Sequence, residues 1–183
     1  ASSSTNFTIG GSQDYVNTNT GAYVSYLWRV NGGTTSALND GDINATGQIN
    51  QTHGCGVLLY TGDGGSSNVT IAHGMGKKPE FLWMKDRDSN GNNNNWEAWH
   101  HNMADDNYLY FNLDSAQAST ANGAIDTSEV SDTLLGFLRT STTGGSQTRF
   151  ENGDNFIIYQ FVGVEGHSKF GSYEGNGNAD GAF

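Results

Sequence analysis

The chain has 183 residues and carries 19 acidic against 8 basic residues, which gives a formal net charge of −11 at neutral pH. This charge repels nucleic acids and anionic membrane surfaces, so neither is an expected partner, whereas divalent cations and neutral glycans are compatible with it. The single cysteine, Cys55, excludes an intramolecular disulfide, and no stretch approaches the roughly 20 apolar residues of a membrane span, so no membrane insertion is expected.

Aromatic residues indicate a folded chain. The 26 glycines and the single proline would also suit a disordered low-complexity protein, but 4 Trp, 8 Tyr and 9 Phe accompany them. Disordered chains normally contain few aromatics, and each buried aromatic ring removes a large apolar area from water. We therefore expect a modest core with long loops.

Strand signals follow one another along the chain as short aromatic and β-branched runs. They lie at residues 22–30, 56–60, 69–71, 81–85, 107–113, 134–139 and 155–162. A weak alanine spacing over Asp114–Ala121 is the one helical signal. Loops such as Asn152–Asp154 supply the positive φ that hairpin turns need. The sequence thus predicts an all-β fold, an antiparallel β-sandwich or jelly-roll-like arrangement with long Gly/Asn-rich loops and little or no helix.

The chain also repeats itself. Residues 22–32 (AYVSYLWRVNG) are similar to residues 156–166 (FIIYQFVGVEG), and residues 56–64 are similar to residues 170–177. Repeats at this spacing suit an elongated appendage in which each unit shields its neighbour. We predict that 1–50 holds the end of a preceding unit plus a linker, that 51–166 is a complete unit, and that 167–183 opens a following unit.

Three segments carry a family resemblance. Ile71–Lys85 resembles the GHGLGxxPxxxxxK segment of a repeat in structural proteins of tailed phages, and Trp96–His100 resembles its WxVYH segment. Val164–Gly177 is similar to its closing VxGxSKFGSYTGNG segment. The resemblance implies a structural or adhesive unit of a tail fibre or related virion protein, located on the extracellular virion, with other virion proteins as partners. It implies no known activity.

A calcium-loop pattern begins at Asp86. Residues 86–97 read D-x-D-x-N-G followed by a closing glutamate, which is the spacing of an oxygen-rich cation loop. The predicted calcium ligands are Asp86, Asp88, Asn90, Asn92 and Glu97. The preceding residues indicate a strand instead of a helix, so a solvated hairpin loop is the alternative.

A polar loop bracketed by tryptophans suggests a second kind of site. Exposed indole rings stack on sugars, and neighbouring amides and carboxylates bond hydroxyl groups. The candidate glycan-binding residues are Asn94, Trp96, Trp99, Asp105 and Asp106. The alternative is that both tryptophans are core or interface residues.

No enzyme motif is present. Gly-x-Ser-x-Gly, His-Glu-x-x-His and the phosphate-binding loop are all missing from the sequence. We therefore expect a non-enzymatic structural or adhesive unit that assembles as a homo-oligomer, with a trimer as the first expectation, and that binds host surface glycans. The alternatives are a capsid decoration protein, a polysaccharide-degrading tailspike domain and a calcium-stabilised adhesin of a cell.

Overall fold

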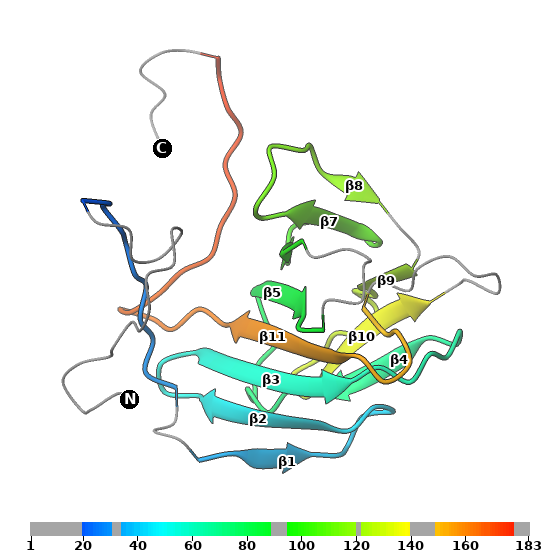
Figure 1. The fold of residues 1–183 in the computed structure, drawn as a ribbon. Helices are drawn as coiled ribbons and strands as arrows, with labels where there is room; N and C mark the ends of the chain where they lie inside the picture. The colour runs from blue at the N-terminus through cyan, green and yellow to red at the C-terminus, as the bar shows by residue number, and fades with distance from the viewer. Residues whose placement is uncertain (1–19, 31–33, 89–94, 120–121, 140–148, 178–183) are drawn as a thin grey trace.

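The computed structural model describes residues 20–30, 34–88, 95–119, 122–139 and 149–177. Within these residues the chain contains strands, turns and extended segments and no helix (Figure 1). The strands are β1 (Ser36–Leu38), β2 (Ala45–Asn50), β3 (Cys55–Thr61), β4 (Val69–Ala72), β5 (Phe81–Asp86), β6 (Glu97–His100), β7 (Asn107–Tyr110), β8 (Ala118–Ser119), β9 (Asn122–Ile125), β10 (Leu134–Arg139) and β11 (Asn155–Phe161).

The strands form two antiparallel sheets. One has the order β1-β2-β3-β11-β5-β6-β7-β8 and the other the order β4-β10-β9. β11, the last strand in the chain, lies inside the larger sheet, with seven residue pairs to β3 and six to β5. The predicted all-β antiparallel sandwich is confirmed.

The core lies between the two sheets. Alternate residues of the long strands point inward, as the two-residue period of a strand requires. The larger sheet contributes Leu58, Tyr60, Leu82, Met84, Trp99, Phe156 and Ile158, and the smaller sheet contributes Val69, Ile71, Ile125, Leu135 and Phe137. Each fully buried large side chain contributes about 1.5–3 kcal/mol through removal of apolar surface from water.

Two segments differ from the sequence prediction. Residues 22–30 have a strand-like composition but join neither sheet. The weak helical signal over Asp114–Ala121 is wrong for residues 114–119, and residues 120–121 lie outside the described residues. Its residues Ala118–Ser119 form β8, which pairs with Asn107 and Tyr108 of β7 and so satisfies its backbone through a ladder.

The predicted division after residue 50 falls in the turn between β2 and β3. These strands pair along their whole length, and β1 pairs with β2 in turn. β1 and β2 therefore belong to the same sheet as β3.

A buried histidine fastens three parts of the sandwich together. His73 follows β4, where Gly74 and Gly76 adopt positive φ values of 69° and 68°. Its Nδ1 accepts a hydrogen bond from the Met75 N–H at 3.2 Å, so the proton lies on Nε2, which donates to the Ser131 carbonyl at 3.2 Å. Gln160 of β11 donates to the His73 carbonyl at 2.7 Å. Burial lowers the pKa of His73, which keeps the ring neutral.

We predict that His73→Ala destabilises the fold by about 2–4 kcal/mol, because it leaves buried backbone groups unpaired and opens a cavity. A histidine with a lowered folded-state pKa costs stability as the pH falls below its unfolded-state pKa of about 6.5. The wild type should therefore lose more stability than His73→Ala between about pH 7.5 and about pH 5.5 in urea unfolding.

His167→Ala is the matched control, because His167 is exposed and its ring contacts only another exposed histidine, His53. This variant should retain the wild-type pH dependence. An identical pH dependence in His73→Ala and the wild type would contradict the prediction.

Candidate cation site at the end of strand β5

Strand pairing brings Asp86 beside the turn that precedes β11. Asp86 is the last residue of β5 and lies opposite Phe156 near the start of β11. The turn runs from Glu151 to Asp154, where the Asp154 N–H donates to the Glu151 carbonyl at 3.1 Å and Gly153 has a φ of 85°. Glycine adopts this left-handed conformation without the strain that a Cβ atom causes. The turn therefore places two more acids near Asp86.

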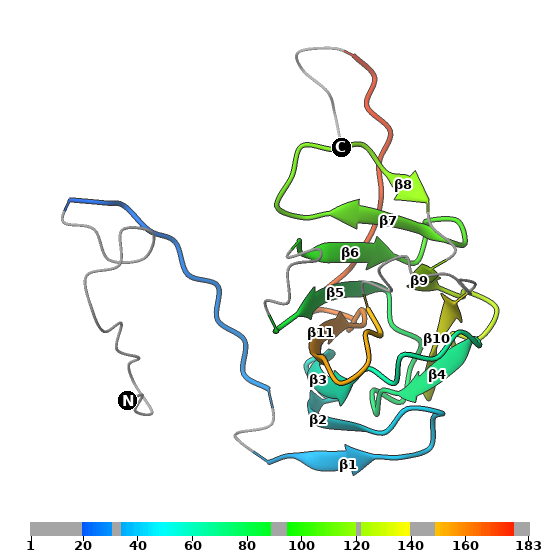
Figure 2. The ribbon, with the colours of Figure 1, turned by 45° about the vertical axis from the view of Figure 1, so that its right-hand side comes forward.

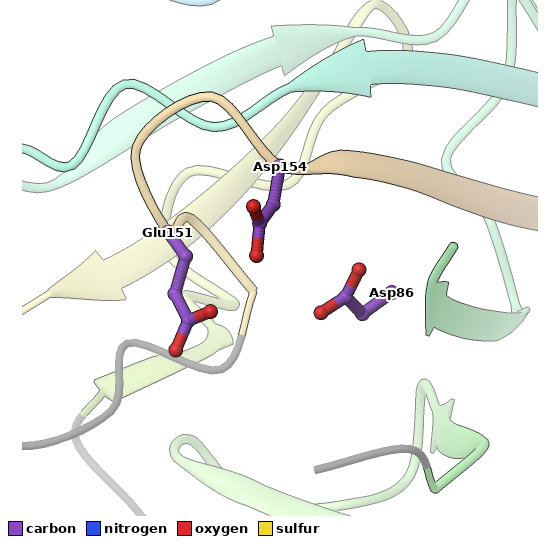
Figure 3. A group of neighbouring side chains, drawn as sticks. All are labelled: Asp86, Glu151 and Asp154. Carbon is purple, nitrogen blue, oxygen red and sulfur yellow. The ribbon is translucent and has the colours of Figure 1, made fainter. Parts of the chain in front are cut away.

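The three carboxylates form one cluster. Asp86, Glu151 and Asp154 each offer an oxygen, and these oxygens all lie within 4.8 Å of one another (Figure 3). Asp86 and Asp154 are buried and Glu151 is partly buried. Calcium is bound by carboxylate and carbonyl oxygens, so this arrangement can hold a divalent cation.

Burial and a neighbouring carboxylate both disfavour the charged form of Asp86. Burial raises the pKa of Asp86, a hydrogen bond from the Asp88 N–H opposes the rise, and the Asp154 charge adds to it. Like charges at such distances disfavour simultaneous ionisation. A bound cation would compensate this repulsion.

Asp88, a second predicted ligand, fastens the chain after β5 to β11. Its backbone N–H donates to Asp86 Oδ1 at 2.8 Å. Its Oδ2 accepts hydrogen bonds from the Asn155 backbone N–H at 2.7 Å and from Asn155 Nδ2 at 2.9 Å. Asp88 thus holds the candidate ligand Asp86 and the start of β11 in register.

Glu97, another predicted calcium ligand, does not join the cluster. Glu97 is buried and forms an ion pair with buried Arg149, and burial raises the pKa of Glu97. Removing one partner from a buried ion pair is strongly destabilising, so Glu97 is committed to the core. Asn90 and Asn92 lie outside the described residues.

Sequence reasoning missed Glu151 and Asp154. Both flank an Asn-Gly turn, and that turn was interpreted only as a connection between strands. The signal that could have found them is the pair of acids around the turn, but their approach to Asp86 depends on the register of β5 against β11. No local spacing encodes that long-range register.

The predicted glycan residues are separated in the structure. Trp99 is 1% exposed in the core, so it is excluded from a sugar-stacking surface. Trp96 lies on the other face of the sheet, 5.9 Å from the Tyr159 ring and below the Lys85 ammonium group. The odd spacing of three residues places the two indoles on opposite faces.

The remaining members of that set serve other roles or are not described. Asp105 is exposed and accepts hydrogen bonds from the backbone N–H and the hydroxyl of Thr127. Asp106 adopts a φ of 57° in the turn before β7, and Asn94 lies outside the described residues. The described residues of the set therefore form no single patch.

Comparison with known proteins identifies the family. The family model described as a domain of unknown function, DUF7483, matches residues 1–183. The chain belongs to the DUF7483 family. No curated protein and no solved structure matches it. In the part of this DUF7483 chain that the structure describes, no helix could cross a membrane.

We predict that about 5 mM calcium raises the melting temperature of the DUF7483 chain by roughly 3–6 °C. This follows from about 1–2 kcal/mol of mass-action stabilisation for a millimolar-range site in a chain of this size. Asp86→Asn should abolish the rise. Without calcium it should also be neutral or stabilising, since an Asp whose pKa is raised on folding lowers stability once the pH exceeds that pKa.

Thermal unfolding followed by circular dichroism, with and without a chelator, provides the measurement. Asp114→Asn removes an exposed acid outside the cluster and serves as the control, so it should keep the full calcium response. An equal response in Asp86→Asn and Asp114→Asn would assign the effect to net charge and reject the site.

Proposed function

We propose that this chain is a non-enzymatic structural or adhesive unit of a bacteriophage tail fibre or related virion appendage, and that it assembles as a homotrimer. The observation that carries the proposal is an apolar surface on the face of the large sheet that points away from the core. Its centre, the outer aromatic cluster, consists of Phe81, Trp83, Tyr159 and Phe161.

The outer aromatic cluster arises from strand alternation. Phe81 and Trp83 of β5 point away from buried Leu82 and lie beside Tyr159 and Phe161 of β11. The Trp83 ring centroid lies 6.4 Å from that of Tyr159 and 5.5 Å from that of Phe161. The outer face of an antiparallel sheet is commonly polar when it meets water, so these rings indicate a covered surface.

Further aromatic residues enlarge this surface. The Phe111 and Trp28 rings lie 5.0 Å and 5.7 Å from the Trp83 ring, yet Phe111 is 62% and Trp28 46% exposed. Contiguous exposed apolar surface marks an interaction site. Because each chain carries a net charge of −11, copies meet most favourably through an uncharged face such as this one.

The buried ionisable groups also support a structural role. Perturbed pKa values often mark catalytic residues, but they also occur in structural networks. Here the ring of His73 bonds backbone groups on two sides, and Glu97 pairs with Arg149 inside the core. These groups have architectural partners, which favours the non-enzymatic proposal over the polysaccharide-degrading alternative.

The adhesive part of the proposal assigns host-glycan contacts to the polar surface around Trp96. Its ring is partly exposed at the margin of the outer face, and Asn95 and Asn112 lie next to it through the hydrogen bond between their side chains. Such single contacts are weak. A trimer would present three of them, and their affinities would combine through effective concentration.

Localisation on virus particles tests the proposed function. We expect antibodies raised against the purified chain to label a tail fibre or another appendage in electron micrographs. Uniform labelling of the capsid would favour the decoration alternative. Release of oligosaccharides from host capsule or lipopolysaccharide by the purified chain would favour the tailspike alternative and would reject the non-enzymatic proposal.

We predict that the purified chain has a solution mass three times that of the 19.6 kDa monomer. Phe111→Ser should shift the population toward monomer, because it removes an exposed ring in contact with the outer aromatic cluster. Light scattering over a range of concentrations provides the measurement. Leu113→Ser is the control, since it removes an exposed apolar side chain, 46% accessible, that is not part of the outer aromatic cluster. A monomeric wild type would contradict the assembly.

A further inference from the structure

Two extended segments lie outside the sandwich. Residues 20–30 run away from the sheets near the amino-terminal end, and residues 165–177 run away near the carboxyl-terminal end (Figures 1 and 2). Neither segment belongs to a strand of either sheet. Yet both expose large apolar side chains, with Val24 at 76%, Leu27 at 75% and Tyr173 at 75%. Such side chains indicate a surface that another chain covers.

The carboxyl-terminal segment resembles β3 and the turn after it in the spacing of one tyrosine and two glycines. Phe170–Gly177 (FGSYEGNG) aligns without gaps to Val57–Gly64 (VLLYTGDG), so that Tyr173 corresponds to Tyr60. The equivalent glycines at the ends of the two segments, Gly64 and Gly177, have positive φ values of 66° and 72°. The segment therefore shares the Tyr-Gly spacing of β3 and a left-handed glycine in the turn that follows it.

The amino-terminal segment resembles β11 in its alternation of apolar and aromatic residues. Residues 22–32 align without gaps to residues 156–166, which places Val24 at the position of Ile158. Ile158 points into the core, while its neighbour Ile157, the equivalent of Tyr23, points outward. The segment thus carries an inward and an outward face like those of β11.

β3 and β11 are neighbours in the sheet, and this fact connects the two segments. We propose that Phe170–Gly177 of one copy and residues 21–25 of a second copy pair as an antiparallel ribbon in the register of β3 and β11. Ile157 lies opposite Leu59 in the sandwich, and the same register sets Tyr23 opposite Ser172. This inference rests on the proposed structural function and names its assembly contact.

Contacts within one chain hold the two segments apart. Asn102 donates a hydrogen bond to Ser172 Oγ at 3.0 Å, which fixes the carboxyl-terminal segment beside the turn between β6 and β7. Asn50 at the end of β2 donates to the Arg29 carbonyl at 3.0 Å, which fixes the amino-terminal segment on the other side of β11. The two segments of one copy therefore do not pair with each other.

Both segments begin at the same aromatic surface. The rings of Trp28 and Phe170 each lie 5.7 Å from the ring of Phe161, and Phe170 also stacks on Phe81. An isolated two-stranded ribbon is marginally stable in water. Here each strand of the ribbon is anchored to the folded sandwich of its own copy, which restricts its freedom before pairing and lowers the entropy cost of association.

The contact is heterologous, since one copy uses its carboxyl-terminal segment and the next uses its amino-terminal segment. When two copies are joined by one such contact, one copy still has a free amino-terminal segment and the other a free carboxyl-terminal segment for further contacts. Such contacts produce a closed ring when the rotation closes and an open filament when it does not. A closed ring of three copies would be the proposed trimer.

Disulfide cross-linking between variants that each carry one engineered cysteine tests the register. Tyr23→Cys chains and Ser172→Cys chains, distinguished by size tags, are mixed and mildly oxidised. Natural Cys55 is retained, because its thiol is buried and burial raises its pKa. We expect the heterodimer to exceed both homodimers several-fold. An intramolecular bond between the two engineered positions cannot form in this design, because each chain carries only one of them.

Val24→Cys mixed with Ser172→Cys is the matched control. A slip of one residue places the two side chains on opposite faces of the ribbon, so this pair should lose the heterodimer excess. Equal yields from the two pairs would overturn the proposed register. A chain that carries both Tyr23→Cys and Ser172→Cys should give a ladder of multimers, whereas conversion to a cross-linked monomer would also overturn the proposal. If antibodies label an appendage but the register-specific cross-link fails, only this inference is rejected.

Discussion

The antiparallel pairing of β11 with β3 on one side and β5 on the other joins the two halves of the eight-stranded sheet. The inward residues of β11 complete the core, and its outward residues complete the outer aromatic cluster. The turn that leads into β11 supplies two of the three clustered carboxylates. Because β11 comes last in the chain, the sheet closes only when distant segments have met, which makes the fold rich in non-local contacts.

The sequence predicts the long central strands well and the edge strands poorly. β3, β5, β10 and β11 are rich in aliphatic and aromatic residues, and the interior of a sheet selects such residues because both faces are covered. β1 and β2 read SAL and ATGQIN, which carry almost no strand signal. The extended conformation of β1 and β2 is set by their hydrogen bonds to the neighbouring strand of the sheet. The reverse case is residues 22–30, whose composition is that of a central strand although the sandwich offers it no place.

The candidate site shows the same limit at the level of single residues. Asp86 could be predicted because its neighbours fit a local cation-loop pattern, whereas Glu151 and Asp154 come from a turn more than sixty residues away in the chain. Trp99 could not be assigned to the core from the sequence around it, because its burial depends on the ladder that places Leu82 opposite it. Which face of β6 points inward follows from its pairing with β5, and a single sequence does not encode that pairing locally.

β3 and β11 each have a neighbour on both sides, so the end segments find no place beside either strand in their own sandwich. β3 is paired with β2 and β11, while β11 is paired with β3 and β5, so the hydrogen-bonding edges of both strands are occupied. A β11-like segment cannot add to this sheet beside β3 without displacing β11 itself, and a β3-like segment faces the same obstacle. Exposed strand-forming sequence with unmatched edges associates with other strands. A second copy carries the complementary segment in the same exposed state, and this complementarity favours defined assembly over irregular aggregation.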